Sequence, residues 1–347
     1  MPKINSSDER SQSRKLKTSK QILAVSIFLI LTFSFSVLFV EYRTPKTGLY
    51  NHINSYWMKR SDQIDLAVLL KSEINHTKQR DVIRKTWAKI NGNLSLKVMY
   101  FFVIGYKNVS ESDWNELQEE NKKFKDVLTF LSNDDFSRIF WDFIWYYDVG
   151  FVKHGFKYLL KCDDSCYVRL KALTRVLKGF ETNYLEGNLD KINESNSVFE
   201  SVEINNVKND NYGQLKKDLY WGYFNNFEMI SYAFNGGYVL STQIVGFLAN
   251  NKNYLRYYHS EDVSVGAWLA PVNNIVRIHD RRFDTEYVSR GCQNYYLIRH
   301  NVSPDEMMEM YKNLKEKRQL CTKEQRNVKE YLYDWSVAPT KCCNRVL

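Results

Sequence analysis

Short apolar runs alternate with helix-forming segments along much of this 347-residue chain, and this alternation restricts its fold more than any other feature. The apolar runs predict buried strands, at Leu66–Leu70, Val98–Ile104, Asp126–Phe130 and His154–Leu160. Helices are predicted between them, at Thr77–Ile90, at Ser112–Phe124 with Ser112 as its cap, and at Phe140–Gly150. Strands that alternate with helices in this way favour an α/β fold with a mostly parallel sheet.

Two adjacent carboxylates, Asp163 and Asp164, stand near the end of the fourth apolar run. Carboxylates are costly to bury without a cation, and α/β sheets place ligands at the carboxyl ends of their strands. The pair therefore predicts an oxygen-ligated metal or a basic partner. A solvated turn or a helix N-cap is the alternative, because Asp is also common there.

Three further segments carry candidate chemistry. Arg80 and Arg84 lie one turn apart on the helix after the first strand, where they could meet a diphosphate, although a solvated basic face would look the same. The double glycine in Asn235–Ser241 suits close backbone approach to a ligand. A second acidic pair lies in His259–Val263. One acidic pair for a metal and one for proton abstraction would serve a metal-assisted group transfer.

An uncharged run of 19 residues, Ile22–Val40, is long enough to cross a bilayer at about 1.5 Å per residue. Basic residues dominate before it, which predicts a cytosolic tail at 1–21 and a lumenal remainder. A cleaved signal peptide is the alternative, but the run is too long for a signal core and no small-residue cleavage site follows. We predict a stem at 41–62 and one lumenal domain at 63–347.

Six cysteines fit a lumenal chain, and four of them lie between residue 292 and the C-terminus, as disulfides that tie down a C-terminal segment would. Their pairing is not readable from the sequence, and a zinc site is the rival, although the usual C-x₂-C spacing is missing. Five glycosylation sequons after the predicted membrane span also suit the secretory pathway, at Asn75, Asn93, Asn108, Asn193 and Asn301. The stretch 183–217 is polar and predicts an exposed loop or insertion.

The formal net charge of +9 does not indicate nucleic acid, because acidic residues are mixed with the basic ones and no dense basic run occurs. Nucleic acid is therefore not a predicted partner.

Several strings resemble one known family, the inverting Golgi β-1,3-glycosyltransferases with a GT-A fold, whose sheet is Rossmann-like. They are VIRKTW at Val82–Trp87, YWGYF at Tyr220–Phe224, GGYVLS at Gly236–Ser241, HSEDVSVGAWLAP at His259–Pro271, HDRRFDTEYVSRGC at His279–Cys292, and YDWS at Tyr333–Ser336, followed by Cys342-Cys343. The two longest strings are most similar to the branch of the family that adds the second galactose of the glycosaminoglycan–protein linker.

The resemblance implies an inverting β-1,3-galactosyltransferase that moves galactose from UDP-galactose to a galactosyl-xylosyl linker acceptor. It also implies a divalent cofactor, usually manganese, and a single-pass type II Golgi membrane protein. A homo-oligomer, or a complex with other linker glycosyltransferases, would be in keeping with it.

The resemblance also implies roles for individual residues. Asp163, Asp164 and Ser165 occupy the family's three-acid metal motif, and His300 matches the histidine that completes the metal shell. Asp262 matches the general base that deprotonates the acceptor hydroxyl. The remaining matches are Arg80, Arg84 and Lys71 in the nucleotide-binding region, with Ser165 beside them, and Gly236, Gly237, Glu261 and Trp221 near donor or acceptor.

Three departures from the family pattern motivate alternatives. Ser165 replaces the third acid, and a hydroxyl is a poorer ligand for a hard cation. Arg138–Asp142 reads RIFWD where the family has N-L-T-x-K. The segment between Gly222 and Gly236 is short, as a lost strand or a mispredicted exon would leave it. The alternatives are a catalytically silent relative that binds or escorts an active enzyme, and a β-1,3-hexosyltransferase with another donor.

Overall fold

The computed structural model describes residues 64–89, 94–107, 109–130, 155–181, 202–204, 218–258 and 260–345. All of them belong to one compact unit, Ser61–Leu347. The predicted tail, membrane span and stem lie outside the described residues, as do the helix predicted at 140–150, the RIFWD departure and most of the polar stretch. Among the helices that are described, none combines the length and the apolar character needed to span a membrane.

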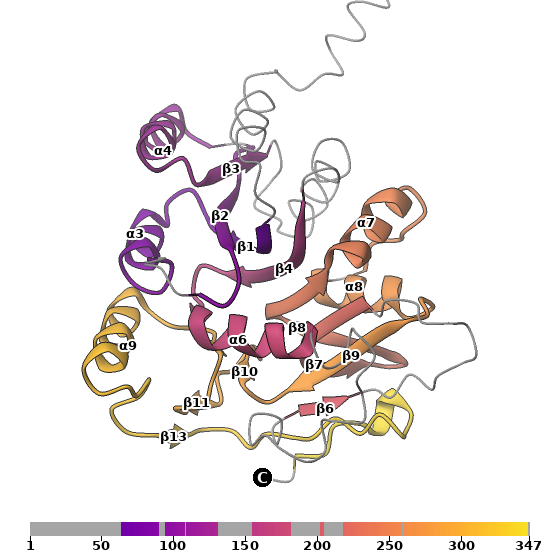
Figure 1. Cartoon of the computed structure of the whole chain (residues 1–347). Helices are drawn as coiled ribbons and strands as arrows, with labels where there is room; N and C mark the ends of the chain where they lie inside the picture. Colours follow the sequence, from indigo (N-terminus) through magenta and orange to yellow (C-terminus); the bar gives the residue numbers. More distant parts are fainter. Residues whose placement is uncertain are drawn as a thin grey trace, which may run out of the picture. The chain divides into compact units, whose positions relative to one another are not determined.

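An eight-stranded mixed sheet forms the centre of the described chain, in the order β3-β2-β1-β4-β8-β7-β9-β6 (Figure 1). The first four strands in that order are parallel to one another, and are β3 (Val127–Phe130), β2 (Val98–Gly105), β1 (Ile64–Lys71) and β4 (Phe156–Asp163). The others are β8 (Ile230–Ser241), β7 (Asp218–Phe227), β9 (Ile275–Asp280) and β6 (Val202–Ile204). The predicted α/β class is thus confirmed, although β4–β8, β8–β7 and β9–β6 pair antiparallel.

Strand β1 shows why the apolar runs become central strands. Leu66, Val68 and Leu70 belong to the main hydrophobic cluster on one face of the sheet. Because side chains alternate along a strand, Ala67 and Leu69 point to the other face, and they too are buried. A strand with both faces covered needs apolar residues at every position, which is the pattern in the sequence.

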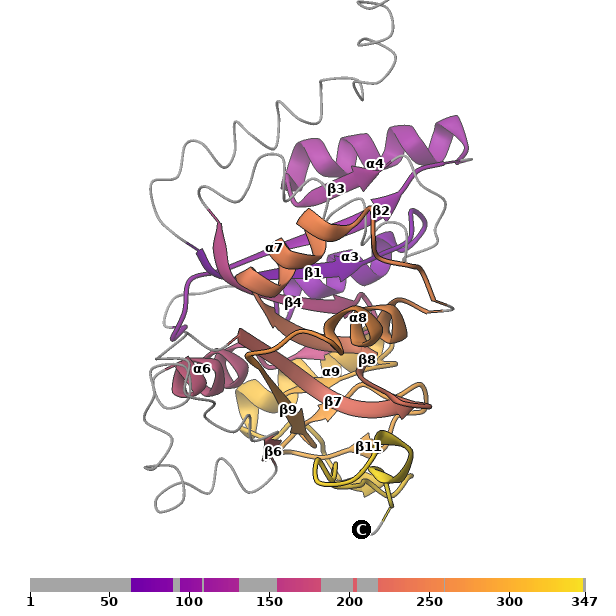
Figure 2. The same ribbon diagram turned by 90° about the vertical axis from the view of Figure 1, so that its right-hand side faces the viewer.

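Helices cover both faces of this sheet. Figure 1 shows α3 (Thr77–Lys85), α6 (Leu170–Phe180) and α9 (Pro304–Glu316) beside one face, and α7 (Thr242–Asn251) and α8 (Glu261–Leu269) beside the other. The view of Figure 2 places α7 and α8 in front of the strands. On the first face, the ring of Phe180 in α6 packs edge-on against Trp221 in β7, with 5.0 Å between centroids.

Local chemistry sets the helix ends, with two differences from the predictions. Helix α3 ends at Lys85, before the predicted Ile90, where the Thr86 hydroxyl donates to Val82 O at 2.7 Å. Helix α4 (Glu111–Phe124) is capped by Ser110, not Ser112, because the Ser110 side chain accepts the Asp113 N–H at 3.1 Å. A capping box formed by Ser303 and Glu306 starts α9.

The short segment between Gly222 and Gly236 forms a tight β-hairpin rather than marking a missing strand. Strands β7 and β8 pair from Phe227 opposite Ile230 back to Tyr220 opposite Leu240. Glu228 makes the turn with φ of 52°, in the left-handed region. The hairpin is therefore complete without the longer segment that the family pattern led us to expect.

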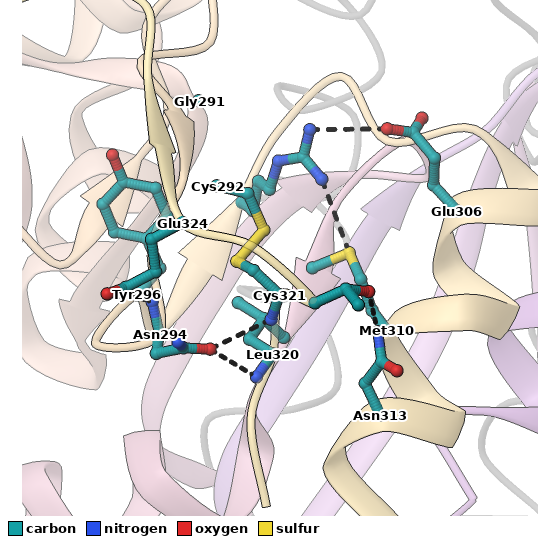
Figure 3. The surroundings of a disulfide bond; sticks show 12 residues. Gly291, Cys292, Asn294, Tyr296, Glu306, Met310, Asn313, Leu320, Cys321 and Glu324 are labelled. Atoms are coloured by element: carbon teal, nitrogen blue, oxygen red, sulfur yellow. Dashed lines mark hydrogen bonds and ion pairs between the residues drawn. A yellow bond between two sulfur atoms is a disulfide. The ribbon is translucent and has the colours of Figure 1, made fainter. Parts of the chain in front are cut away.

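Two small sheets and two disulfides organise the C-terminal part. Strand β12 (Ile298–Arg299) lies between β10 (Phe283–Asp284) and β5 (Tyr167–Val168), while β11 (Gly291–Cys292) pairs with β13 (Gln325–Arg326). Cys292 is bonded to Cys321, and Cys342 to Cys343. Figure 3 shows the Asn294 side chain beside the first disulfide, where it accepts the Leu320 and Cys321 N–H groups at 2.8 and 3.0 Å. All four C-terminal cysteines are thus used in disulfides.

Candidate active site

The acidic pair lies at the carboxyl end of β4, in the middle of the sheet. Asp163 is the last residue of that strand and sits opposite Lys71 of β1. The Asp164 N–H donates to Lys71 O at 2.9 Å, and the Cys166 N–H donates to Asp163 O at 3.1 Å. These two bonds close a tight turn at residues 163–166, which we call the acidic turn. The structure therefore places the two carboxylates where the sequence predicts a ligand site.

The small β10-β12-β5 sheet brings His300 to the acidic turn. The residue follows β12, which pairs with β5 directly after the turn, and its N–H donates to Asp284 O at 2.8 Å. Its Nε2 lies 3.4 Å from Asp163 Oδ2. Burial would lower the pKa of His300, but the contact with Asp163 and the neighbouring Cys166 raise it to about 9. At neutral pH the structure thus pairs an imidazolium with a carboxylate.

His76 is a second histidine at the acidic turn, and sequence reasoning missed it. Its Nδ1 lies 2.8 Å from Asp164 Oδ2, and this hydrogen bond raises the pKa of His76. His76 is the N-cap residue of α3. The only signal in the sequence was its position directly before the first helix of an α/β unit, where ligands are often met.

Lys161 is a buried cation that links the acidic turn to α8. Its Nζ lies 3.4 Å from Asp163 Oδ1 and 3.1 Å from Glu261 Oε2, and it donates to Asn235 O. The side chain is only 1% exposed. Burial would lower the pKa of Lys161, but Asp163 and Glu261 raise it, so the ammonium stays charged. Lys161 also acts on Asp163. Burial would raise the pKa of Asp163, but Lys161 and His300 lower it to about 2.

The second acidic pair occupies the first turn of α8. The Asp262 carboxylate accepts three hydrogen bonds, from Ser260 Oγ at 2.6 Å, Val263 N at 2.9 Å and Asn235 N at 3.2 Å. These bonds fix its orientation at a helix N-terminus, where backbone N–H groups favour an anion. The backbone of Asn235 thus contacts both Lys161, through its carbonyl oxygen, and Asp262, through its N–H group. A proton acceptor held this firmly is suited to general-base chemistry.

Glu261, the neighbour of Asp262, lies buried on α8 and has a raised pKa. It is 4% exposed, and the Tyr238 hydroxyl donates to it. Burial, opposed in part by Lys161 and reinforced by the charge of Asp262, raises the pKa of Glu261 to about 7. The two adjacent acids therefore present one carboxylate held by hydrogen bonds and one carboxyl that takes up a proton near neutral pH.

The double glycine serves a close approach within the chain itself, which corrects the prediction of close approach to a ligand. A Cβ on Gly236 would lie 2.7 Å from Thr285 O and 3.0 Å from His300 Cγ. Gly237 stands opposite Cys162 in the β4–β8 pairing. Strand β8 can therefore pass beneath the loop that carries His300 only because no side chain intervenes.

The two arginines assigned to the nucleotide lie elsewhere, in the scaffold. Arg80 is fully buried, and all three of its guanidinium nitrogens donate to protein groups, including both Glu120 oxygens at 2.8 and 2.7 Å. Arg84 contacts Glu120 at 2.6 Å and both oxygens of Asp126 at 2.8 Å. These ion pairs hold α3 against α4, so neither the diphosphate role nor the solvated basic face predicted for them describes their position.

Of the other residues predicted for the site, one lies in the core and two lie at the acidic turn. Trp221 is fully buried in β7 and donates to Asp280 Oδ2 at 2.8 Å, so it belongs to the core rather than to a donor or acceptor surface. Lys71 lies at the acidic turn, and its charge helps to lower the pKa of Asp163. Ser165 also lies in the turn, where its carbonyl oxygen accepts the Val302 N–H at 2.8 Å.

The acidic turn does not present a three-ligand metal site. Among the described residues, no group of three His, Cys, Asp or Glu side chains is arranged to hold a metal ion. The two oxygens of Asp163 face Lys161 and His300, while an oxygen of Asp164 contacts His76. A hard divalent cation needs several free oxygen ligands, and here protein cations take their place. The residues as arranged do not fit the implied manganese ion.

Comparison with known proteins shows which family this chain belongs to. Residues 78–281 match the family model described as Galactosyltransferase. The mouse protein named beta-1,3-galactosyltransferase 6 is 31% identical over 304 residues, which cover 81% of this chain and 82% of that protein. Two proteins of Arabidopsis thaliana, hydroxyproline O-galactosyltransferase GALT6 and beta-1,3-galactosyltransferase GALT1, are 25% and 27% identical over 76% and 75% of this chain.

The extent of these matches differs between relatives. This chain spans only 37% and 39% of the lengths of the two plant proteins. Among solved structures, that of TarS from S. aureus matches with a TM-score of 0.34 and 10% identity, over 72% of this chain and 39% of that one.

Proposed function

The chain belongs to the galactosyltransferase family, and from this premise we propose that it is an inverting β-1,3-galactosyltransferase that uses UDP-galactose and a galactosyl-xylosyl linker acceptor. That it is a UDP-sugar glycosyltransferase follows from the family match and the mouse relative. The finer identity of donor and acceptor is the proposal, and its support is the similarity of the His259–Pro271 and His279–Cys292 strings to the linker enzyme.

The observation that carries the proposal is the position of Asp262. Its carboxylate is held at the start of α8 by three hydrogen bonds, and the backbone of Asn235 together with Lys161 connects it to the acidic turn. An inverting transfer needs one base on the acceptor side of the sugar and a second site for the nucleotide. We assign the base to Asp262 and the nucleotide site to the acidic turn, and Lys161 and the backbone of Asn235 hold the two together.

In the proposed reaction Asp262 accepts the proton of the acceptor hydroxyl as that oxygen bonds to the anomeric carbon of galactose. The bond from this carbon to the UDP oxygen breaks, so the linkage changes from α to β and UDP leaves. Manganese has no step in this scheme, because His76, Lys161 and His300 contact the carboxylates that would bind it.

We also propose a cellular setting. A GT-A-type domain in the Golgi lumen, carried by a type II membrane span at 22–40, would be consistent with two disulfides, which persist in oxidising compartments. A homo-oligomer or a complex with other linker glycosyltransferases belongs to the same proposal.

The test of the proposed activity is incubation of the purified chain with UDP-galactose and Gal-β-1,4-Xyl, with and without manganese. Nuclear magnetic resonance of the product should show a new β-1,3 linkage. A panel of other UDP-hexoses tests the alternative that the enzyme transfers a different sugar. Absence of turnover with every donor, together with no detectable binding of UDP, would contradict the proposal.

The second candidate is a silent relative that binds or escorts an active enzyme. The observation that favours it is the replacement of the third acid by Ser165 in a turn whose carboxylates are already paired. Product formation in the wild type and in Asp262→Asn separates the two functions: a transferase should form product, and the substitution should abolish it. A silent relative should form no product in the wild type, so the substitution would change nothing in the transfer assay.

A further inference from the structure

Cys162 directly precedes the acidic turn, Cys166 is its last residue, and these are the two cysteines outside the disulfides. Cys162 is the next-to-last residue of β4, and Cys166 directly precedes β5. Both are completely buried. No step of the proposed transfer uses either thiol, so their presence at this turn needs a separate explanation.

Both thiols lie against the same short piece of backbone. Cys162 stands opposite Gly237 in the β4–β8 pairing, and a Cβ on Gly237 would be 3.5 Å from Cys162 Cβ. The Cys166 Sγ donates to the carbonyl oxygen of Gly236, the preceding residue, at 2.9 Å. The Cys166 N–H bond to Asp163 O folds the chain back after the strand. Two thiols packed on adjacent glycines are therefore neighbours.

The two side chains also interact directly. A hydrogen bond links the Cys162 and Cys166 side chains, and both residues are fully buried. Buried cysteines are often inert, but that behaviour belongs to isolated thiols in apolar surroundings. Here two thiols meet in a chain whose other four cysteines are all in disulfides. Disulfides of that kind form where the compartment is oxidising.

We propose that Cys162 and Cys166 form a third disulfide, which closes a covalent ring around Asp163, Asp164 and Ser165. The oxidant is a small-molecule disulfide such as glutathione disulfide. One cysteine thiolate attacks it and releases one glutathione thiol; the other cysteine then attacks the mixed disulfide and releases the second. The two cysteines lose two hydrogens in total, and the oxidant gains them.

The bridge forms before the turn is packed beneath β8, because both thiols are inaccessible in the folded chain. Burial then protects it from reduction. Its consequence is a restricted turn: the strand end and the start of β5 are tied together, so the two carboxylates move as one unit. The inference is independent of which sugar is transferred and holds whether or not the chain is an active enzyme.

Peptide mapping of the full chain, secreted or extracted from an oxidising compartment, tests the proposal. The protein is denatured in excess N-ethylmaleimide without reductant and digested with trypsin. Cleavage after Lys161 and Arg169 gives one peptide with both cysteines, Cys162–Arg169. We expect this peptide to lack two hydrogens and to carry no maleimide, and to gain two maleimide groups only if it is reduced first.

The same digest contains its own control. The Cys292–Cys321 disulfide should join the peptides Gly291–Arg299 and Gln319–Lys323, which shows that oxidised bonds survive the procedure. If that pair is joined while Cys162–Arg169 carries two maleimides, the proposal is wrong. A peptide that joins Cys162 or Cys166 to any C-terminal cysteine would also overturn it.

Single variants give a second readout that does not depend on activity. Cys162→Ser should leave Cys166 as one free thiol per chain, and Cys166→Ser should leave Cys162, against none in the wild type, when thiols are counted in denaturant. Two free thiols in the wild type would contradict the proposal, and so would one variant whose thiol count does not change. Because the count is made on denatured protein, a variant that folds poorly still answers the question.

Discussion

Lys161 and Glu261 meet in the interior, with 3.1 Å between Nζ and Oε2, and their side chains are only 1% and 4% exposed. One belongs to the strand that ends in the acidic turn and the other to the helix that carries Asp262. This contact, together with the Lys161 bond to Asn235 O, joins the two halves of the candidate active site.

Replacing Lys161 should therefore destabilise the fold. Lys161→Met leaves Asp163 without its buried cation, and loss of one partner from such a pair costs about 3 kcal/mol of unfolding free energy. The matched control is Lys157→Met on the same strand, whose ion pairs with Asp65 and Glu181 are more than a third exposed on the lysine side and contribute about 1 kcal/mol or less. Urea denaturation measures both. Equal losses in the two variants would contradict the role given to Lys161.

The unfolding free energy of the protein should decrease as pH rises from about 5 to 7, because of the raised pKa of Glu261. Its pKa is raised from 4.5 to about 7, so in this window the folded state holds a proton that the unfolded state has released. Stability that depends on a bound proton is lost as pH rises. Lys161, Asp163, Asp262 and Tyr238 are the charged or titratable groups around Glu261.

The measurement is the unfolding free energy of wild type and Glu261→Gln across pH 4.5 to 8. Glutamine is neutral throughout, so the variant should lose the downward slope between about pH 5 and 7 and keep the slopes due to other groups. An unchanged slope in Glu261→Gln would show that Glu261 titrates outside this window.

Each histidine at the acidic turn should report on its own aspartate. The pKa of His300 is raised to about 9 partly by Asp163, and the pKa of His76 is raised chiefly by Asp164. Asp163→Asn should therefore lower the pKa of His300 and leave His76 nearly unchanged, while Asp164→Asn should do the reverse. Imidazole proton shifts followed against pH measure both values. A single variant that lowers both pKa values equally would contradict the separate pairing.

Asp262→Asn should remove transfer without removing the nucleotide site. Loss of a positioned general base costs about 10²- to 10⁴-fold in rate, whereas UDP would bind at the acidic turn as before. The assay is product formation at saturating donor, with UDP affinity measured by calorimetry. Asp305→Asn, at an 89% exposed side chain, is the matched control and should be unaffected. Full activity in Asp262→Asn would exclude it as the base.

Gly236→Ala should be one of the most damaging small substitutions in the chain. Its Cβ would lie 2.7 Å from Thr285 O, a backbone atom that cannot yield cheaply, and strain of this kind costs about 1–3 kcal/mol. Gly246→Ala is the control, since a Cβ there meets nothing within 4 Å and alanine favours the helix by about 1 kcal/mol. Thermal melting should shift in opposite directions. A neutral Gly236→Ala would refute the close approach.

The strands and the site's location in the sheet could be predicted from the sequence, because both depend on local pattern. The run Leu66–Leu70 is apolar at every position, and that alone requires a strand covered on both faces. Asp163 and Asp164 stand where such a run ends, so their place at a carboxyl edge also followed from order along the chain.

The partners of the charged residues were decided only by the tertiary structure. His76 and Asp164 are 88 residues apart in the sequence and 2.8 Å apart in space, because β1 and β4 are neighbours in the sheet. Arg80 has the helical position of a ligand-binding residue, yet Glu120 of α4 binds it. A periodic pattern specifies which face of an element is buried, but charged groups find their partners through strand order and helix packing. The sequence thus determined where the acidic residues lie, and the fold determined which cations they contact.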